Sequence, residues 1–385
     1  MSQSPLSLDP DQVTIGNSSV EDSWKVCVID GVYFGENEYN GSLGARISSI
    51  FVIFACSTAA TLFPVLARRY PNMRIPTSVY LFFRHFGAGV ILATAFIHLM
   101  DPAYGAIGPD TCVGMTGHWA DYSFVAAIIL GTIYLIFLLD LASSVYVQRK
   151  YGIVHDHHEN KVEDLITDQS ARVYNPHVHR HEECADVRDP DQDITDVTGA
   201  NKGHDVESFD ETKSTVSSDS VKSFESQFAA FLILEFGVIF HSVMIGLNLG
   251  STGDEFRNLY IVLVFHQTFE GLGIGARMSA IPFPRGKRWI PYVFAFAYGL
   301  STPIATAIGL GVRTTYVSSS YTVNVVSGVL DAISAGILIY TALVELVARD
   351  FIFNDQRTSN LGRLSYIIVC HMLGTGLMAL LGKWA

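Results

Sequence analysis

Long apolar stretches separated by shorter polar connections run through this chain. A helix needs about 20 mainly apolar residues to cross the hydrocarbon core of a bilayer, and the stretches are of that order. They occupy residues 47–67, 86–100, 123–147, 228–250, 259–278, 289–312, 325–347 and 364–382. The pattern predicts an all-α integral membrane protein with eight transmembrane helices. An even number of spans places both termini on the same side of the membrane.

The connection at residues 151–225 differs from the others in composition. Eighteen acidic residues there oppose seven basic ones, and seven of the thirteen histidines of the chain lie in it. A segment so polar and so charged is predicted to be disordered. Its histidine clusters, which include His177, His179 and His181, favour weak and exchangeable metal binding. A solvated acidic linker is the alternative.

Basic residues concentrate in alternate short loops, and loops rich in arginine and lysine face the cytoplasm. Those loops contain Arg68, Arg69, Arg74, Arg84, Arg277, Arg285, Lys287, Arg288, Arg349, Arg357 and Arg363. We therefore expect an extracellular tail at 1–42, transmembrane helices 1–3 at 43–150, a cytoplasmic loop at 151–225 and helices 4–8 at 226–385. Both termini are predicted to be extracellular.

Composition excludes a soluble globular protein. Hydrophobic residues make up 49% of the chain, charged residues only 16%, and the mean hydropathy is +0.30. The expected partner is the lipid bilayer, and no nucleic-acid partner is expected. Of the cysteines, Cys56 and Cys370 lie within spans and Cys184 lies in the acidic loop. A disulfide between the remaining two, Cys27 and Cys112, is one arrangement that the sequence leaves open.

Metal-binding side chains lie near the middle of the fourth and fifth spans. The fourth contains His241 with Ser242, and the fifth contains His266, Gln267 and Glu270. Ionisable residues at that depth are costly and usually mark an ion or substrate path, although a single buried histidine is more often a hydrogen-bonded core residue. His266 and Glu270 are four residues apart and share a helix face. The same feature in two adjacent spans indicates a divalent-cation site.

Imidazole nitrogen with carboxylate oxygen is a ligand set that suits zinc, and with less specificity iron(II) or manganese(II). Gly246 and Gly250 on the fourth span, and Gly271 and Gly275 on the fifth, form GxxxG pairs. Such pairs allow close approach of helix backbones in lipid. We expect them to bring these two helices together, so that both sets of ligands reach one ion.

Further charged side chains lie toward the ends of the spans. On the second span, His98 and Asp101 predict a vestibule for cations, with an interfacial histidine before a helix-ending Asp-Pro as the alternative. On the seventh span, Asp331 and Glu345 lie roughly on one face, about 21 Å apart at 1.5 Å per residue. Asp140, near the inner end of the third span, and Glu345 are candidates for a cytoplasmic exit. Snorkelling at the interface is an equal alternative.

The segments HSVMIGLNLG, FHQTFEGLGIGARM and SAGILIYTALVEL, with eight spans and a histidine-rich loop after the third, resemble the ZIP metal transporters. The segments MALLGKWA and NEYNGSLGARISSIFVI are similar to its fungal plasma-membrane zinc uptake branch. The resemblance implies import of zinc(II) as cargo, without a cofactor. It implies a path along spans two, four, five and seven, with His241, His266 and Glu270 at its centre and His98 and Ser242 as further ligands.

The chain departs from the two-metal pattern of some members, because Ile245 and Thr302 stand at positions that are acidic there. The resemblance therefore implies a single central ion. It also implies alternating access, in which a bundle of spans one, four, five and six slides against the rest. A homodimer, and recognition of the acidic loop by the ubiquitin and endocytosis machinery, are further expectations.

Two other classes of protein use similar residues. A membrane-embedded zinc hydrolase would hold its metal permanently, with three protein ligands and an activated water. A metal-sensing receptor would use the central site without flux. Candidate ligands at both ends of the spans, as well as at the centre, favour a transport path over the enzyme.

The arginine distribution makes a prediction about topology. Epitope tags at residue 1, at residue 385 or within 103–118 should bind antibody on intact cells, whereas a tag within 185–220 should do so only after permeabilisation. Staining of the 185–220 tag on intact cells would reverse the predicted orientation.

Overall fold

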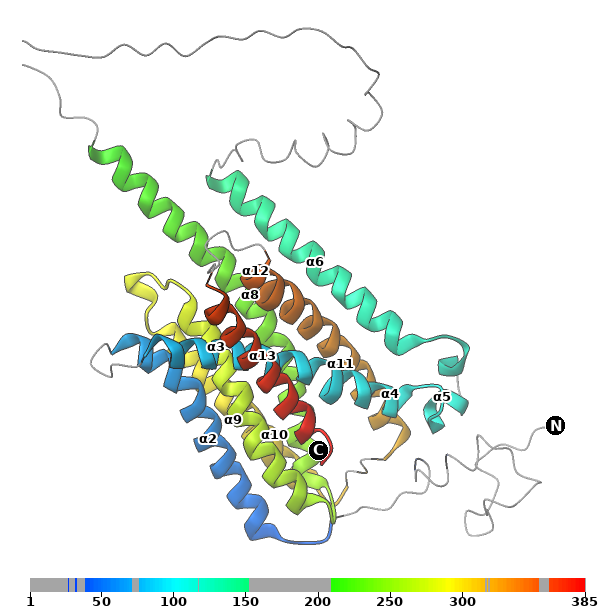
Figure 1. Ribbon diagram of the computed structural model, residues 1–385. Helices are drawn as coiled ribbons and strands as arrows, with labels where there is room; N and C mark the ends of the chain where they lie inside the picture. The colour runs from blue at the N-terminus through cyan, green and yellow to red at the C-terminus, as the bar shows by residue number, and fades with distance from the viewer. Residues whose placement is uncertain are drawn as a thin grey trace, which may run out of the picture.

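The computed structural model describes residues 27, 32, 39–70, 76–116, 118–151, 209–315, 317, 319–352 and 360–384. In these residues every regular element is helical (Figure 1). The elements are α2 (Leu43–Arg69), α3 (Thr77–Ala93), η4 (Thr94–Met100), α4 (Asp101–Ile107), α5 (Cys112–Thr116), η5 (His118–Asp121), α6 (Phe124–Tyr151), α8 (Phe209–Ser251), α9 (Phe256–Ala280), η6 (Arg285–Lys287), α10 (Ile290–Val312), α11 (Tyr321–Tyr340), η7 (Thr341–Ala348), α12 (Arg349–Phe351) and α13 (Leu361–Leu381).

The prediction of eight spans is confirmed, because eight helices of the described residues are long and apolar enough to cross a membrane. Their directions alternate along the chain. In Figure 1, α2 begins and α13 ends at the lower end of the bundle, whereas α6 ends and α8 begins at the upper end. Large apolar side chains such as Phe51, Leu135 and Ile304 are exposed on the outside of the bundle, as expected for a surface that faces lipid.

The second span continues through Asp101 and Pro102 to Ile107 as one apolar stretch from Thr77, so the alternative in which this pair ends the helix is wrong. The residues before it form a π-helical turn, in which the backbone N–H of Asp101 bonds to the carbonyl of Phe96. Proline lacks an N–H and its ring clashes with the preceding turn of a regular α-helix. A wider π turn directly before it lets the helix continue.

The glycine pairs of the fourth and fifth spans do not pack against each other, so that expectation is wrong. A Cβ at Gly246 or Gly250 would collide with the backbone of α10, near Thr302 and Leu310. The glycine pair of α9 faces α2 instead. A Cβ at Gly275 would collide with the carbonyl of Thr61, and one at Gly271 with the Thr61 hydroxyl. A GxxxG pair shows that close approach is allowed but does not identify the partner helix.

Arg46 of α2 is fully buried and holds the turn between α8 and α9. Its guanidinium donates hydrogen bonds to the carbonyls of Leu249 (3.2 Å), Gly250 (3.2 Å) and Thr252 (2.5 Å). These carbonyls belong to the C-terminal end of α8, where backbone acceptors lack helical partners and partial negative charge accumulates. The guanidinium also lies 4.4 Å from the ring centroid of Phe256, at the start of α9. The ends of three spans on the same side of the bundle are thus joined at one side chain.

Cys27 and Cys112 lie 85 positions apart in the sequence and form a disulfide, so the arrangement that the sequence left open is present in the structure. The bond ties the tail to α5, after the second span. At the other end of the bundle, α8 already begins at Phe209, within the segment expected to be loop. Residues 152–208, with His177, His179 and His181, lie outside the described residues.

The contact between α9 and α2 yields a prediction about stability. Gly275→Ala should lower the free energy of unfolding by about 2 kcal/mol, as for other overpacked interiors, because its methyl group would overlap the Thr61 carbonyl. Gly131→Ala on α6 is the matched control, since a Cβ there meets no atom within 4 Å. Thermal melting of the detergent-purified proteins measures both. Equal melting temperatures for the two variants would show that α9 does not depend on this contact.

Candidate metal site

A cavity of about 480 Å³ runs from one end of the bundle to the middle of the fourth and fifth spans. Its wall includes five of the residues proposed from the sequence, namely His98, Asp101, His241, His266 and Asp331. Asn248 and Ser319 line it near the ends of their helices. On α8 and α9 the lining stops at His241 and His266. The cavity therefore ends at the two central histidines.

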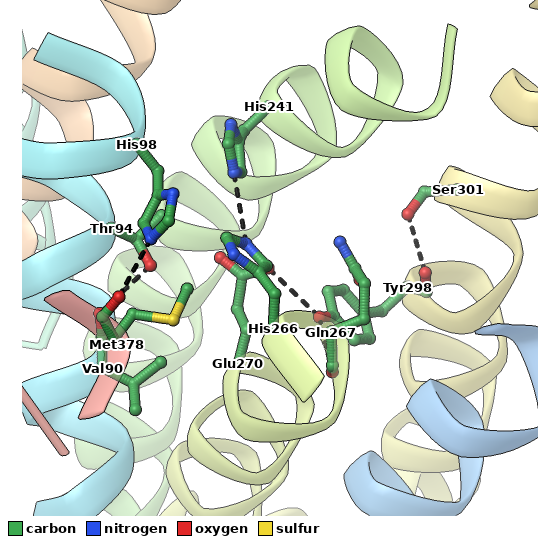
Figure 2. Close-up of polar contacts among 10 residues, drawn as sticks. All are labelled: Val90, Thr94, His98, His241, His266, Gln267, Glu270, Tyr298, Ser301 and Met378. Carbon is green, nitrogen blue, oxygen red and sulfur yellow. Dashed lines mark hydrogen bonds and ion pairs between the residues drawn. The ribbon is translucent and has the colours of Figure 1, made fainter. Parts of the chain in front are cut away.

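The two central histidines meet through their Nε2 atoms, which are 3.3 Å apart (Figure 2). Two nitrogens bound to one tetrahedral zinc, each 2.0–2.1 Å from the metal, are separated by about the same distance. His266 Nε2 is also 3.8 Å from Glu270 Oε2, slightly longer than an edge of such a tetrahedron. Both histidines and Glu270 are buried. The spacing suits a shared ion, with a small movement of the carboxylate.

His98 approaches the pair from the second span. Its ring centroid is 4.8 Å from that of His266, with the rings edge to face. Its Nε2 is 3.2 Å from the backbone carbonyl of Met378 on α13. A carbonyl only accepts, so Nε2 carries the proton and Nδ1 is the nitrogen of the neutral ring that can bind a metal. Figure 2 shows the three rings converging from three helices.

In the described part of the chain, no group of three His, Cys, Asp or Glu side chains is already arranged to hold a metal ion. The centre therefore offers a pair of nitrogens with a carboxylate and a third imidazole nearby. An ion bound there would retain water in its remaining coordination positions. A conducting site has to bind its ion well enough for entry and loosely enough for exit, and an incomplete set of protein ligands is compatible with this requirement.

Glu270 is held by Tyr298 of α10, whose hydroxyl lies 3.2 Å from Glu270 Oε2 and 3.2 Å from the backbone carbonyl of Gln267. Glu270 Oε1, both side-chain amide atoms of Gln267 and the hydroxyl of Ser242 are buried and have no hydrogen-bond partner among the described residues. None of these three side chains lines the cavity. Ser242 and Gln267 each follow one of the central histidines in the chain, and Glu270 lies about one turn further along α9.

The acidic residues proposed for the exit lie apart from the cavity and are paired. Arg277 of α9 donates to Glu345 Oε2 at 3.1 Å, and Arg349 donates to the same oxygen at 2.5 Å. Tyr340 donates to Asp140 Oδ2 at 3.0 Å. Of the two carboxylates on the seventh span, Asp331 of α11 thus borders the cavity, while Glu345 joins η7 to α9 at the far end.

Three important side chains are not among the functional candidates that the sequence indicates. Glu235 is an acid inside the fourth apolar window, and this alone could have identified it. Arg277 entered only as a basic loop residue, although it faces the buried carboxylate of Glu345. Tyr298 gave no signal, because a tyrosine within an apolar span is ordinary. Its contact with Glu270 depends on how α10 packs against α9.

The family model and the relatives that match this chain are zinc transporters. A family model described as ZIP Zinc transporter matches residues 43–382. Zinc-regulated transporter 1 of Saccharomyces cerevisiae is 59% identical over 98% of this chain and 97% of its own length. Zinc-regulated transporter 1 of Schizosaccharomyces pombe is 40% identical over 91% of this chain and 88% of its own. Zinc transporter 9 of Oryza sativa subsp. japonica is 31% identical over 88% and 89%.

Proposed function

The chain belongs to the ZIP zinc transporter family, and on that premise we propose that it imports zinc(II) through the plasma membrane into the cytoplasm. The observation that carries the proposal is the His241–His266 pair, with Glu270 beside it, at the end of a cavity that opens to one side only. Under the orientation expected from the arginines, that side is extracellular. Both termini then lie outside the cell.

The cavity would concentrate cations before they reach the pair. Asp101 and Asp331 line its wall, and carboxylates in a narrow cleft raise the local concentration of positive ions. His98 would receive the ion next, through Nδ1, and pass it to the pair. The neutral imidazoles offer nitrogen donors, while Glu270 offers the negative charge that offsets the loss of water around a doubly charged ion.

Release would require the far end of the bundle to open. The Arg277–Glu345 ion pair joins α9 to η7 there, so these helices would separate during alternating access. We place α2, α8, α9 and α10 in one moving group, within which glycines pack α8 on α10 and α9 on α2. The second, third, seventh and eighth spans would form the other group. Gly273 of α9 also packs on Gly87 of α3, and the two groups would slide along this contact.

The comparisons give no support to a hydrolase, and the family consists of transporters. Zinc is favoured as cargo because the pair supplies two imidazole nitrogens, whereas iron(II) and manganese(II) are the alternatives within the family. Competition of each metal with radiolabelled zinc uptake separates them. A homodimer, and recognition of the loop by the ubiquitin and endocytosis machinery, stay predictions.

Variants of the central residues test the proposal. Glu270→Gln should reduce maximal zinc uptake about 100-fold, because the site keeps its shape but loses a charge worth a few kcal/mol to a buried ion. His241→Ala should be nearly as severe. His98→Ala, at the cavity wall, should mainly raise KM. The measurement is initial uptake of radiolabelled zinc against concentration in a zinc-starved host, normalised to protein at the cell surface.

Glu255→Gln is the matched control for the carboxylate, since Glu255 is exposed in the turn that precedes α9. It should transport like the unmodified chain. Near-normal maximal uptake by Glu270→Gln or His241→Ala would remove the pair from the path, even though the family assignment would stand.

The acidic loop gives a separate prediction. Replacing residues 155–204 with a Gly/Ser linker should change initial zinc uptake by no more than a few-fold, because a disordered segment adds little to a packed bundle. It should prolong the time that the protein stays at the surface in high zinc, measured by surface labelling. Loss of uptake by a correctly localised replacement would place the loop in the path.

A further inference from the structure

Glu235 is a buried charged side chain of α8 that has no role in the transport path described so far. It lies inside the membrane span that begins at Gln227, and only 2% of its surface is accessible. Neither of its carboxylate oxygens has a hydrogen-bond partner among the described residues. An unpaired buried carboxylate costs several kcal/mol in an apolar environment. In a membrane span such a group indicates a function.

Glu235 lies beyond the closed end of the cavity. It precedes His241 by six residues, which is about 9 Å along a helix. It shares its helix face with Ser242, seven residues later, and the hydroxyl of Ser242 is also buried without a partner. Gly246 continues this face and packs against α10. Glu235 and Ser242 therefore face α10, the helix that carries Tyr298.

Tyr298 connects this face to the central site. Its hydroxyl donates to Glu270 Oε2, and it interacts electrostatically with both Glu270 and Glu235. The two carboxyl groups also interact with each other directly. Three carboxylate oxygens in this buried region have no hydrogen-bond partner among the described residues. They are the two oxygens of Glu235 and Oε1 of Glu270.

We propose that Glu235 and Glu270 form a second divalent-cation position, one step beyond the His241–His266 pair toward the end of the bundle at which Glu345 lies. Glu270 would serve both positions, turning from the nitrogens to Glu235 as the ion advances. The position would hold a partly hydrated ion, since only two acidic side chains contribute. This inference rests on the proposed transport function.

A proton on Glu235 would not satisfy this region. A protonated carboxyl still needs an acceptor for its O–H and donors for its remaining lone pairs, and Glu235 has neither among the described residues. A divalent cation neutralises two carboxylates at once and binds their free oxygens. The position also revises the expectation of a single ion. That expectation came from the absence of acids at Ile245 and Thr302, whereas Glu235 supplies a carboxylate six residues before His241.

Zinc binding by the purified full-length protein tests the position without transport. Equilibrium dialysis with zinc alone should show one ion fewer per chain for Glu235→Gln than for the unmodified protein. Zinc held by the loop histidines is common to both proteins and cancels in the difference. Glu225→Gln, on the same helix before the span begins, should bind as many ions as the unmodified protein. Equal binding by all three proteins would overturn the proposal.

Uptake provides the second measurement. Glu235→Gln should lower maximal zinc uptake at least about tenfold while KM changes less than about twofold, because the ion reaches Glu235 only after it has entered the pair. Glu235→Asp, which keeps the charge, should recover part of the rate. If Glu235→Gln does not reach the surface, Glu235→Met replaces it, and the same loss of one ion is expected.

These outcomes separate this inference from the proposed function. If the unmodified chain imports zinc and Glu235→Gln matches it in both maximal uptake and ion count, this inference fails and the transport function stands. If the unmodified chain imports no zinc, the proposed function fails, and a Glu235-dependent ion in dialysis would then show a binding site without transport.

Discussion

Close contacts between helix backbones at glycine residues determine where the candidate metal-binding side chains lie. In lipid, helices gain little from burying apolar side chains against each other, so van der Waals contact at small residues holds them together. Gly275 brings α9 against Thr61 of α2, and Gly246 brings α8 against α10. His241 and His266 meet because α8, which carries His241, is held against α10, and α9, which carries His266, is held against α2. A larger side chain at either glycine would shift one histidine away from the other.

The buried carboxylates fall into two sets, one paired with arginine and the other with oxygens that have no hydrogen-bond partner among the described residues. At one end of the bundle Glu345 is paired with Arg277 and Arg349. At the centre the oxygens of Glu235 and one oxygen of Glu270 have no partner among the described residues. Paired charges favour a closed arrangement of the helices, whereas unpaired carboxylates favour entry of a cation. The cavity reaches from one end of the bundle to the two central histidines and stops before both sets.

The sequence alone determined the class of the protein, its eight spans and most of the candidate metal-binding side chains. These conclusions were accessible because they depend on local properties of the chain. A span is recognised by about 20 apolar residues in succession, and His241, His266 and Glu270 stand out because a polar side chain is unusual at that depth. The family motifs lie in the same segments, so the family assignment needed no tertiary information.

Only the tertiary structure decided which helices touch and which polar groups find partners. The glycines showed that close approach was allowed, yet they pack α8 on α10 and α9 on α2. Glu345 and Glu235 are both acids within apolar spans, but the first meets Arg277 and the second meets no donor in the described residues. Burial and pairing depend on residues far apart in the chain. The pattern of a single helix therefore places a side chain on a face without showing what that face meets.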